Sequence, residues 1–177
     1  SPERPSEQDT HFNVALFRQA PLSVGFDSHD DVALHPLLHL VDWASINPYS
    51  VRLSAEDGEF LDALDYPIAL NSFATSPACR VLKLSLFPRR DPRFETVVVV
   101  DRQGVRCAKV LQSFATYWDG PAPTAAAAAV RRDERLSRTA EVSRDDARGQ
   151  ELAFEGWSDP AVWPGGTVVV EGGGFWI

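Results

Sequence analysis

Residues 81–120 read VLKLSLFPRRDPRFETVVVVDRQGVRCAKVLQSFATYWDG, and this stretch decides the fold. In residues 81–87 the side chains alternate with a period of two, which predicts a strand. Residues 95–101 contain a run of valines, which favours a second strand. Residues 104–120 then place apolar side chains at spacings of three and four, the pattern of an amphipathic helix. The sequence therefore predicts a hairpin followed by a helix that packs on it.

Two further apolar stretches follow the predicted helix and complete a sheet. Residues 151–157 and 167–173 both have the composition of strands, and a loop with proline and glycine separates them. The order of hairpin, helix and two more strands predicts an α+β fold with a mainly antiparallel sheet and one packed amphipathic helix. The same order is found in the β-grasp, or ubiquitin-like, architecture, and this similarity of order implies no function.

The chain of 177 residues is long enough for one domain with a core of its own. Residues 1–31 are mostly polar, and we expect them to be partly disordered. We therefore predict a single domain over residues 32–177. Within it, residues 122–147 contain an alanine run followed by a charged sequence, which predicts a helical excursion.

The distribution of charge argues against nucleic acid as a partner. The net charge is −8, and residues 1–80 account for it with 12 Asp and Glu against 4 Lys and Arg. A nucleic-acid binder needs a basic surface to neutralise phosphates, whereas this acidic half favours basic partners or solubility. No apolar run is long enough to span a membrane, and two cysteines make no disulfide framework. We expect a cytoplasmic or nucleo-cytoplasmic protein.

A second informative stretch is HDDVALHPLLHLVDW, residues 29–43. His35 and His39 stand at a spacing that can place two imidazoles on one helical face to bind zinc. Pro36 disfavours a helical conformation of His35, so a helix here would begin at Pro36 with His35 as its cap, and the rings would diverge. We therefore expect no metal and no cofactor. The pattern favours structural histidines, and a catalytic histidine is the alternative.

Several short motifs follow one another in a characteristic order. They are Leu34-His35-Pro36-Leu37-Leu38, Asp42-Trp43, Pro48, the segment ATSPACRVLKL, Gly104-Val105, Phe154-Glu155-Gly156-Trp157 and Gly166-Thr167-Val168. Over roughly residues 32–171 this order resembles a family of uncharacterised domains, abundant in mushroom-forming (basidiomycete) fungi and catalogued as a domain of unknown function. The chain departs from the family at PTAAAAAVRRDERLSR, where members usually have an Arg-rich segment. The resemblance implies the α+β fold and carries no established activity.

Tryptophans are the remaining candidates for a binding site. Trp43 follows the histidine segment, and WSDPAVWP, residues 157–164, is expected to be a loop that presents Trp157 and Trp163. Because exposed tryptophans often anchor a partner, we predict a binding or interaction domain. It would recognise a protein or a small apolar ligand through acidic and aromatic surface.

The alternative function is a small metal-independent enzyme. In it, His35 or His39 would act as general acid or base in an aromatic-lined pocket, on an apolar or aromatic metabolite. A closed pocket with convergent polar groups would favour this enzyme, and a flat or grooved patch would favour the binding domain.

Overall fold

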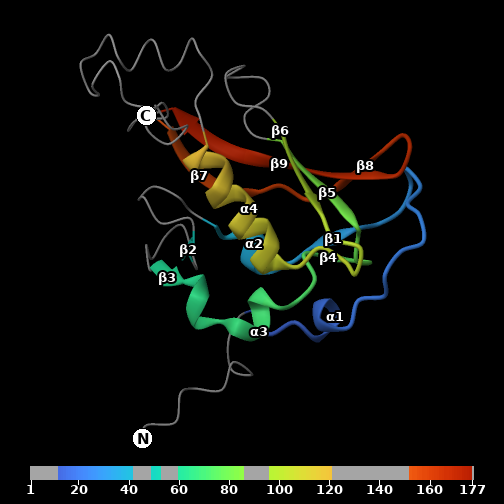
Figure 1. Ribbon diagram of the computed structural model, residues 1–177, viewed down its shortest axis with the longest axis horizontal. Helices are drawn as coiled ribbons and strands as arrows, with labels where there is room; N and C mark the ends of the chain where they lie inside the picture. The colour runs from blue at the N-terminus through green and yellow to red at the C-terminus, as the bar shows by residue number, and fades with distance from the viewer. Residues whose placement is uncertain (1–11, 42–48, 53–59, 86–95, 121–151, 177) are drawn as a thin grey trace, which may run out of the picture.

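The computed structural model describes residues 12–41, 49–52, 60–85, 96–120 and 152–176. Its main sheet and the helix α4 are shown in Figure 1. Their bounds are Val81–Ser85 for β5, Thr96–Val100 for β6, Cys107–Asp119 for α4, Leu152–Trp157 for β7, Ala161–Trp163 for β8 and Thr167–Trp176 for β9. The hairpin and the helix that residues 81–120 predict are confirmed.

The strand order of the main sheet is β6-β5-β9-β7, and β8 also pairs with β9. β5 is antiparallel to β6 and parallel to β9. Both β7 and β8 are antiparallel to β9. Parallel neighbours require a crossover connection, and α4 lies between β5 and β9 in the chain. The predicted α+β fold with a mainly antiparallel sheet is confirmed, and the strand order agrees with the expected β-grasp-like order.

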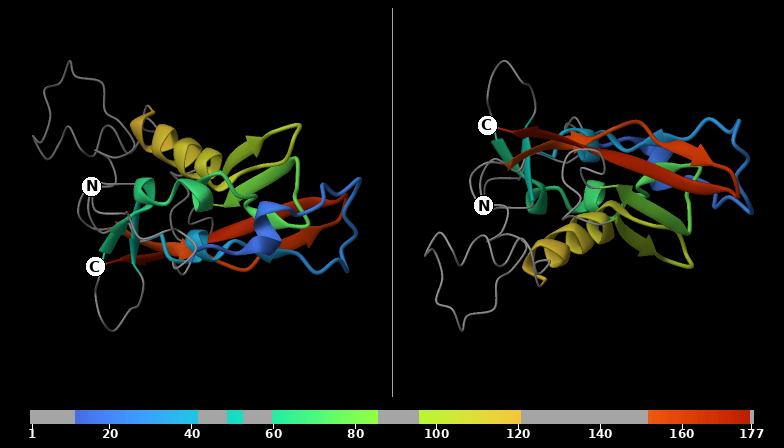
Figure 2. Two further views of the ribbon diagram at one scale, coloured as in Figure 1. Left: turned by 90° about the horizontal axis from the view of Figure 1, so that it is seen from below. Right: turned by 90° about the horizontal axis from the view of Figure 1, so that it is seen from above.

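Helix α4 packs on one face of this sheet (Figure 2). The buried side chains of the helix are Cys107, Val110, Leu111, Phe114 and Tyr117. They form one hydrophobic cluster with the strand residues Leu82, Leu84, Val99, Val168 and Val170. Leu82 and Leu84 share the covered face because alternate side chains of a strand point to the same side. The apolar stripe of residues 104–120 is therefore the core side of α4.

Short elements from the N-terminal half pack on the same core. They are α1 (Ala15–Arg18), β1 (Ala33–Leu34), α2 (Pro36–His39), β2 (Ser50–Arg52), β3 (Phe60–Asp62), η2 (Ala63–Asp65), α3 (Pro67–Leu70) and β4 (Thr75–Ser76). Phe12, Phe17 and Ala20 are buried. Packed structure thus includes residues ahead of the boundary expected at residue 32, because a few apolar side chains in a polar segment suffice to dock it. The predicted excursion at 122–147 lies outside the described residues.

The end of α2 lies against β7 through a close backbone contact. A Cβ added at Gly156 would lie 2.0 Å from the carbonyl oxygen of His39. The φ angle of Gly156 is +76°, a conformation that other residues rarely adopt. The pairing of β7 with β9 shifts register between Phe154 and Trp157, where this glycine lies. Gly156 therefore lets α2 approach the sheet and places His39 beside the end of β7.

Candidate interaction surface

The face of the sheet opposite to α4, named here the outer face, carries exposed apolar side chains. Residues that pair directly share a face, so Val81 lies beside Val100 and Lys83 lies beside Val98. Val81 is 40%, Val98 56% and Val100 52% exposed. The valines suit a pleated strand, but on this side no described helix covers them and they leave apolar area in solvent.

Strands β8 and β9 extend the outer face. Val169 of β9 pairs with Lys83 on one side and with Ala161 on the other, and Trp163 follows Ala161 by two residues, so it points the same way. The outer face thus comprises Val81, Lys83, Val98, Val100, Ala161 and Trp163, together with Val169, which is buried at 2% exposure. Of the eight exposed large hydrophobic residues in the described part of the chain, four lie here: Val81, Val98, Val100 and Trp163. Exposed apolar area is therefore concentrated on this face.

Lys83 stacks on the tryptophan of the outer face. Its Nζ lies 5.2 Å from the centroid of the Trp163 ring, within the range of a cation–π interaction worth about 0.5–1 kcal/mol at an exposed site. This contact restricts the indole, so less side-chain freedom is lost when a partner covers it. The outer face therefore combines a positioned aromatic ring with a positive charge among apolar side chains.

An exposed acidic loop lies beside the β8–β9 end of the sheet. A Cβ added at Gly166 would lie 2.8 Å from the carbonyl oxygen of Phe26, and Figures 1 and 2 show the blue loop next to this turn. The loop exposes Asp27, Asp30 and Asp31. The carboxylates of Asp27 and Asp30 accept hydrogen bonds from backbone N–H groups of the same loop. Acidic and aromatic residues therefore come close together at this end of the molecule.

The tryptophans singled out by the sequence differ in their positions. Trp157 is buried and packs edge-to-face on Phe114, with ring centroids 5.2 Å apart, so its side chain belongs to the core and not to a recognition loop. Trp163 is 43% exposed on β8. Trp43 lies outside the described residues. The segment 161–163 is a strand instead of the expected loop because it pairs with β9.

His35 is a buried structural residue at the start of α2. Its Nδ1 accepts a hydrogen bond of 3.1 Å from the backbone N–H of Leu37, so it caps the helix that begins at Pro36, as predicted. The ring packs on Phe17 with centroids 4.9 Å apart. Burial lowers the pKa of His35 from 6.5 to about 4. The ring is therefore neutral at pH 7, with its proton on Nε2.

His39 joins the end of α2 to the end of β7. Its Nδ1 lies 2.9 Å from the backbone oxygen of Trp157 and donates to it, because a carbonyl only accepts. Its Nε2 lies 3.2 Å from Oδ1 of Asp159, whose side chain is 91% exposed. This second contact is attractive when the ring is protonated. In the neutral ring the proton lies on Nδ1, which donates to Trp157, and Nε2 faces the exposed carboxylate of Asp159.

The two histidines do not share a site in the structure. The ring of His35 is buried, whereas that of His39 is partly exposed next to Asp159. In the described parts of the chain, no group of three or more His, Cys, Asp or Glu is placed to hold a metal ion. Cys79 and Cys107 are buried free thiols, and burial raises the pKa of both. Neither thiol thus has the thiolate character of a nucleophile.

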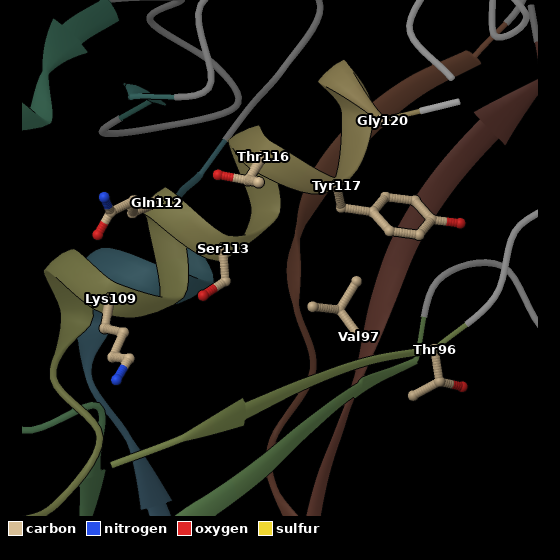
Figure 3. A pocket seen from close by; sticks show the side chains of 8 residues that line it. All are labelled: Thr96, Val97, Lys109, Gln112, Ser113, Thr116, Tyr117 and Gly120. Atoms are coloured by element: carbon tan, nitrogen blue, oxygen red, sulfur yellow. The ribbon is translucent and has the colours of Figure 1, made fainter. Parts of the chain in front are cut away.

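A cleft of about 570 Å³ lies between α4 and β6 (Figure 3). It is lined by Thr96, Val97, Lys109, Gln112, Ser113, Thr116, Tyr117 and Gly120. Among the described residues that the sequence singled out, His35, His39, Trp157 and Trp163 do not line it. Sequence reasoning missed this cleft, although the polar positions 109, 113 and 116 beside the apolar stripe of α4 were a visible signal. They line a cleft only because β6 lies alongside.

No protein-family model, curated protein or solved structure matches this chain. The resemblance to the fungal domains of unknown function stays a prediction. Among the helices described, none is both long and apolar enough to cross a membrane. The structure therefore shows an α+β domain with an exposed apolar sheet face.

Proposed function

We propose that this protein is a binding domain that recognises another protein through the outer face of its sheet. The observation that carries this proposal is the concentration of exposed apolar side chains on that face, with Trp163 held against Lys83. Exposed apolar side chains gathered on one face are typical of an interaction site. Tryptophan is also one of the residue types enriched among those that dominate binding energy.

The chemistry of the surface defines the kind of partner. Val81, Val98 and Val100 favour an aliphatic surface, and Lys83 favours an acidic group within it. The loop with Asp27 and its neighbours favours basic side chains at the rim of the partner. The exposed residues of the face come from β6, β5 and β8, which suits a folded protein better than a small molecule that needs a concave site. We place this interaction in the cytoplasm or nucleo-cytoplasm, the location expected from the sequence.

The alternative of a metal-independent enzyme has less support. His35 is buried and neutral at pH 7, and Nε2 of His39 faces the exposed carboxylate of Asp159. Neither histidine lines the cleft between α4 and β6. A catalytic activity that His39→Ala abolishes while the fold is preserved would favour the enzyme instead.

Replacing Trp163 with alanine should weaken binding of a protein ligand by a factor of tens. Truncating such an anchor typically costs about 2 kcal/mol or more, and every 1.4 kcal/mol is about tenfold in affinity. A protein ligand is first selected for binding to the full chain, from a display library of small folded domains with randomised surfaces. Calorimetry then measures the affinity of this ligand for the native chain and for the variant. Because Trp163 is only half buried, the denaturation midpoint should change little.

Leu64→Ala is the matched control for this experiment. Leu64 is an exposed apolar residue of η2, which lies away from β8 (Figure 1), so its removal should leave the affinity unchanged. If Trp163→Ala unfolds the protein, the tryptophan is a core residue and the proposal fails. The proposal also fails if the selected ligands bind Trp163→Ala as tightly as the native chain.

A further inference from the structure

Strand β6 lies at the edge of the main sheet and, within the described residues, pairs only with β5. Beyond its end, the backbone N–H of Asp101 donates to the carbonyl of Arg80. Hydrogen-bonded and non-hydrogen-bonded pairs alternate along an antiparallel ladder. Thr96, Val98 and Val100 are therefore in non-hydrogen-bonded pairs and direct their N–H and C=O groups away from β5. The open edge thus presents donors and acceptors from three residues.

The sequence of β6 lacks the features that protect strand edges. Its five residues TVVVV include no charged residue and no proline. Its register with β5 is unbroken, so no bulge turns the edge away. Edges of this kind readily accept another strand, and proteins otherwise blunt them. The edge of β6 therefore has the properties required for strand addition.

The cleft between α4 and β6 runs beside this edge. Lys109, Ser113 and Tyr117 follow at intervals of four along α4 and point toward β6 (Figure 3). Nζ of Lys109 lies 3.7 Å from Oδ2 of Asp101, and both side chains are partly exposed. Among the described residues that line the cleft, Lys109 is the one with a charged side chain. The cleft thus offers a positive charge together with hydroxyl and amide groups.

We propose that this cleft binds an extended segment of another protein, which adds to β6 as a further strand of the sheet. Backbone hydrogen bonds to Thr96, Val98 and Val100 provide affinity, and alternate side chains provide specificity. Side chains on the α4 side enter the polar cleft, where Lys109 favours an acidic group. Those on the other side lie next to Val98 and Val100, where β-branched aliphatic residues fit. This site goes beyond the proposed function and does not involve Trp163.

The composition of the cleft argues against a second copy of β6 as the occupant. Pairing β6 with β6 would place valine side chains of the strand TVVVV in the cleft. The polar groups of Lys109, Ser113 and Thr116 would then lose water without gaining a hydrogen-bond partner, which is unfavourable. A segment with acidic or hydroxyl side chains at alternate positions satisfies these groups.

The probe is an acetylated and amidated heptapeptide of alternating glutamate and valine, titrated into the ¹⁵N-labelled full chain. We expect saturable shifts of the amide resonances of Thr96, Val98 and Val100 and of α4. A heptapeptide of alternating lysine and valine should bind about fivefold more weakly, because a partly exposed ion pair contributes up to roughly 1 kcal/mol. N-methylation of the alternate amides that face β6 should abolish binding, and N-methylation of the other set should leave it nearly unchanged.

Substitutions in the protein, instead of changes in the peptide, test the same contacts. Val98→Pro removes an N–H that points away from β5, so the edge strand tolerates it. The substitution should lower the affinity for the glutamate peptide by about tenfold, the effect of losing a backbone hydrogen bond. Val98→Thr keeps the N–H and the β-branched shape and should weaken binding less. Lys109→Gln should remove the preference for glutamate over lysine.

The results that would overturn this inference are specific. They are the absence of saturable binding by the native chain, or equal effects of the two N-methylated sets. The comparison of the two N-methylated peptides uses the native chain, so it remains valid if Val98→Pro fails to fold. A dimer in light scattering that Val98→Pro abolishes would assign the edge to a second copy instead. None of these measurements involves Trp163, so the failure of this inference is distinguishable from the failure of the proposed function.

Discussion

Replacing Phe114 with alanine should lower the free energy of unfolding by about 3–5 kcal/mol, the range for deleting a buried aromatic side chain. Phe114 lies in α4, is fully buried and packs edge-to-face on Trp157. The substitution removes the apolar contact and the aromatic pair. It also leaves a cavity between the helix and the sheet that the surrounding residues fill only in part. Chemical denaturation followed by far-UV circular dichroism measures the loss.

Gln112→Ala is the control for this prediction. Gln112 is exposed on the same helix, and a substitution away from buried contacts usually changes stability by at most about 0.5 kcal/mol. A denaturation midpoint of Phe114→Ala equal to that of the native chain would mean that α4 does not pack on the sheet.

Lowering the pH from 7 to 4 should remove about 3 kcal/mol of stability through His35 alone. Burial lowers the pKa of His35 to about 4 in the folded protein, whereas the unfolded chain keeps a value near 6.5. Between these two values the unfolded state binds a proton that the folded state excludes, so stability falls as the pH falls. The contribution is complete above about pH 7 and is lost by about pH 4, at about 1.4 kcal/mol per unit of pKa difference.

His35→Asn isolates this contribution. The asparagine oxygen can accept the hydrogen bond of the Leu37 N–H and cap α2, but the side chain does not titrate. The free energies of unfolding of both proteins are compared at pH 7 and pH 4, so the effects of other titrating groups cancel. The stability of the native chain relative to His35→Asn should decrease by about 3 kcal/mol. An equal pH dependence of the two proteins would mean that the folded chain protonates His35 as readily as the unfolded chain.

Predictions that rest on local patterns agree with the structure. The alternation in residues 81–87 and the stripe in residues 104–120 correspond to β5 and α4, because each pattern reflects the backbone geometry of a single element. The cap formed by His35 was predictable for the same reason, since the restriction imposed by Pro36 acts on the residue directly before it.

Features that depend on contacts between distant segments were not predictable. Trp157 and Trp163 lie only six residues apart in the chain, yet the packing of β7 under α4 buries the first and the position of β8 exposes the second. Residues 161–163 become a strand only because β9 pairs with them. The cleft likewise joins Lys109 to Val97 across two elements, and the packing of the core sets their relative position.

Cross-saturation NMR tests most directly whether the outer face recognises another protein. In the complex with the selected protein ligand, irradiation of the ligand reduces the signal intensity of chain residues in contact with it. We expect losses at the methyl groups of Val81, Val98 and Val100 and at the indole of Trp163, while Leu64 stays unaffected. Losses confined to α1 or η2, with full intensity at Trp163 and the three valines, would contradict the proposed function.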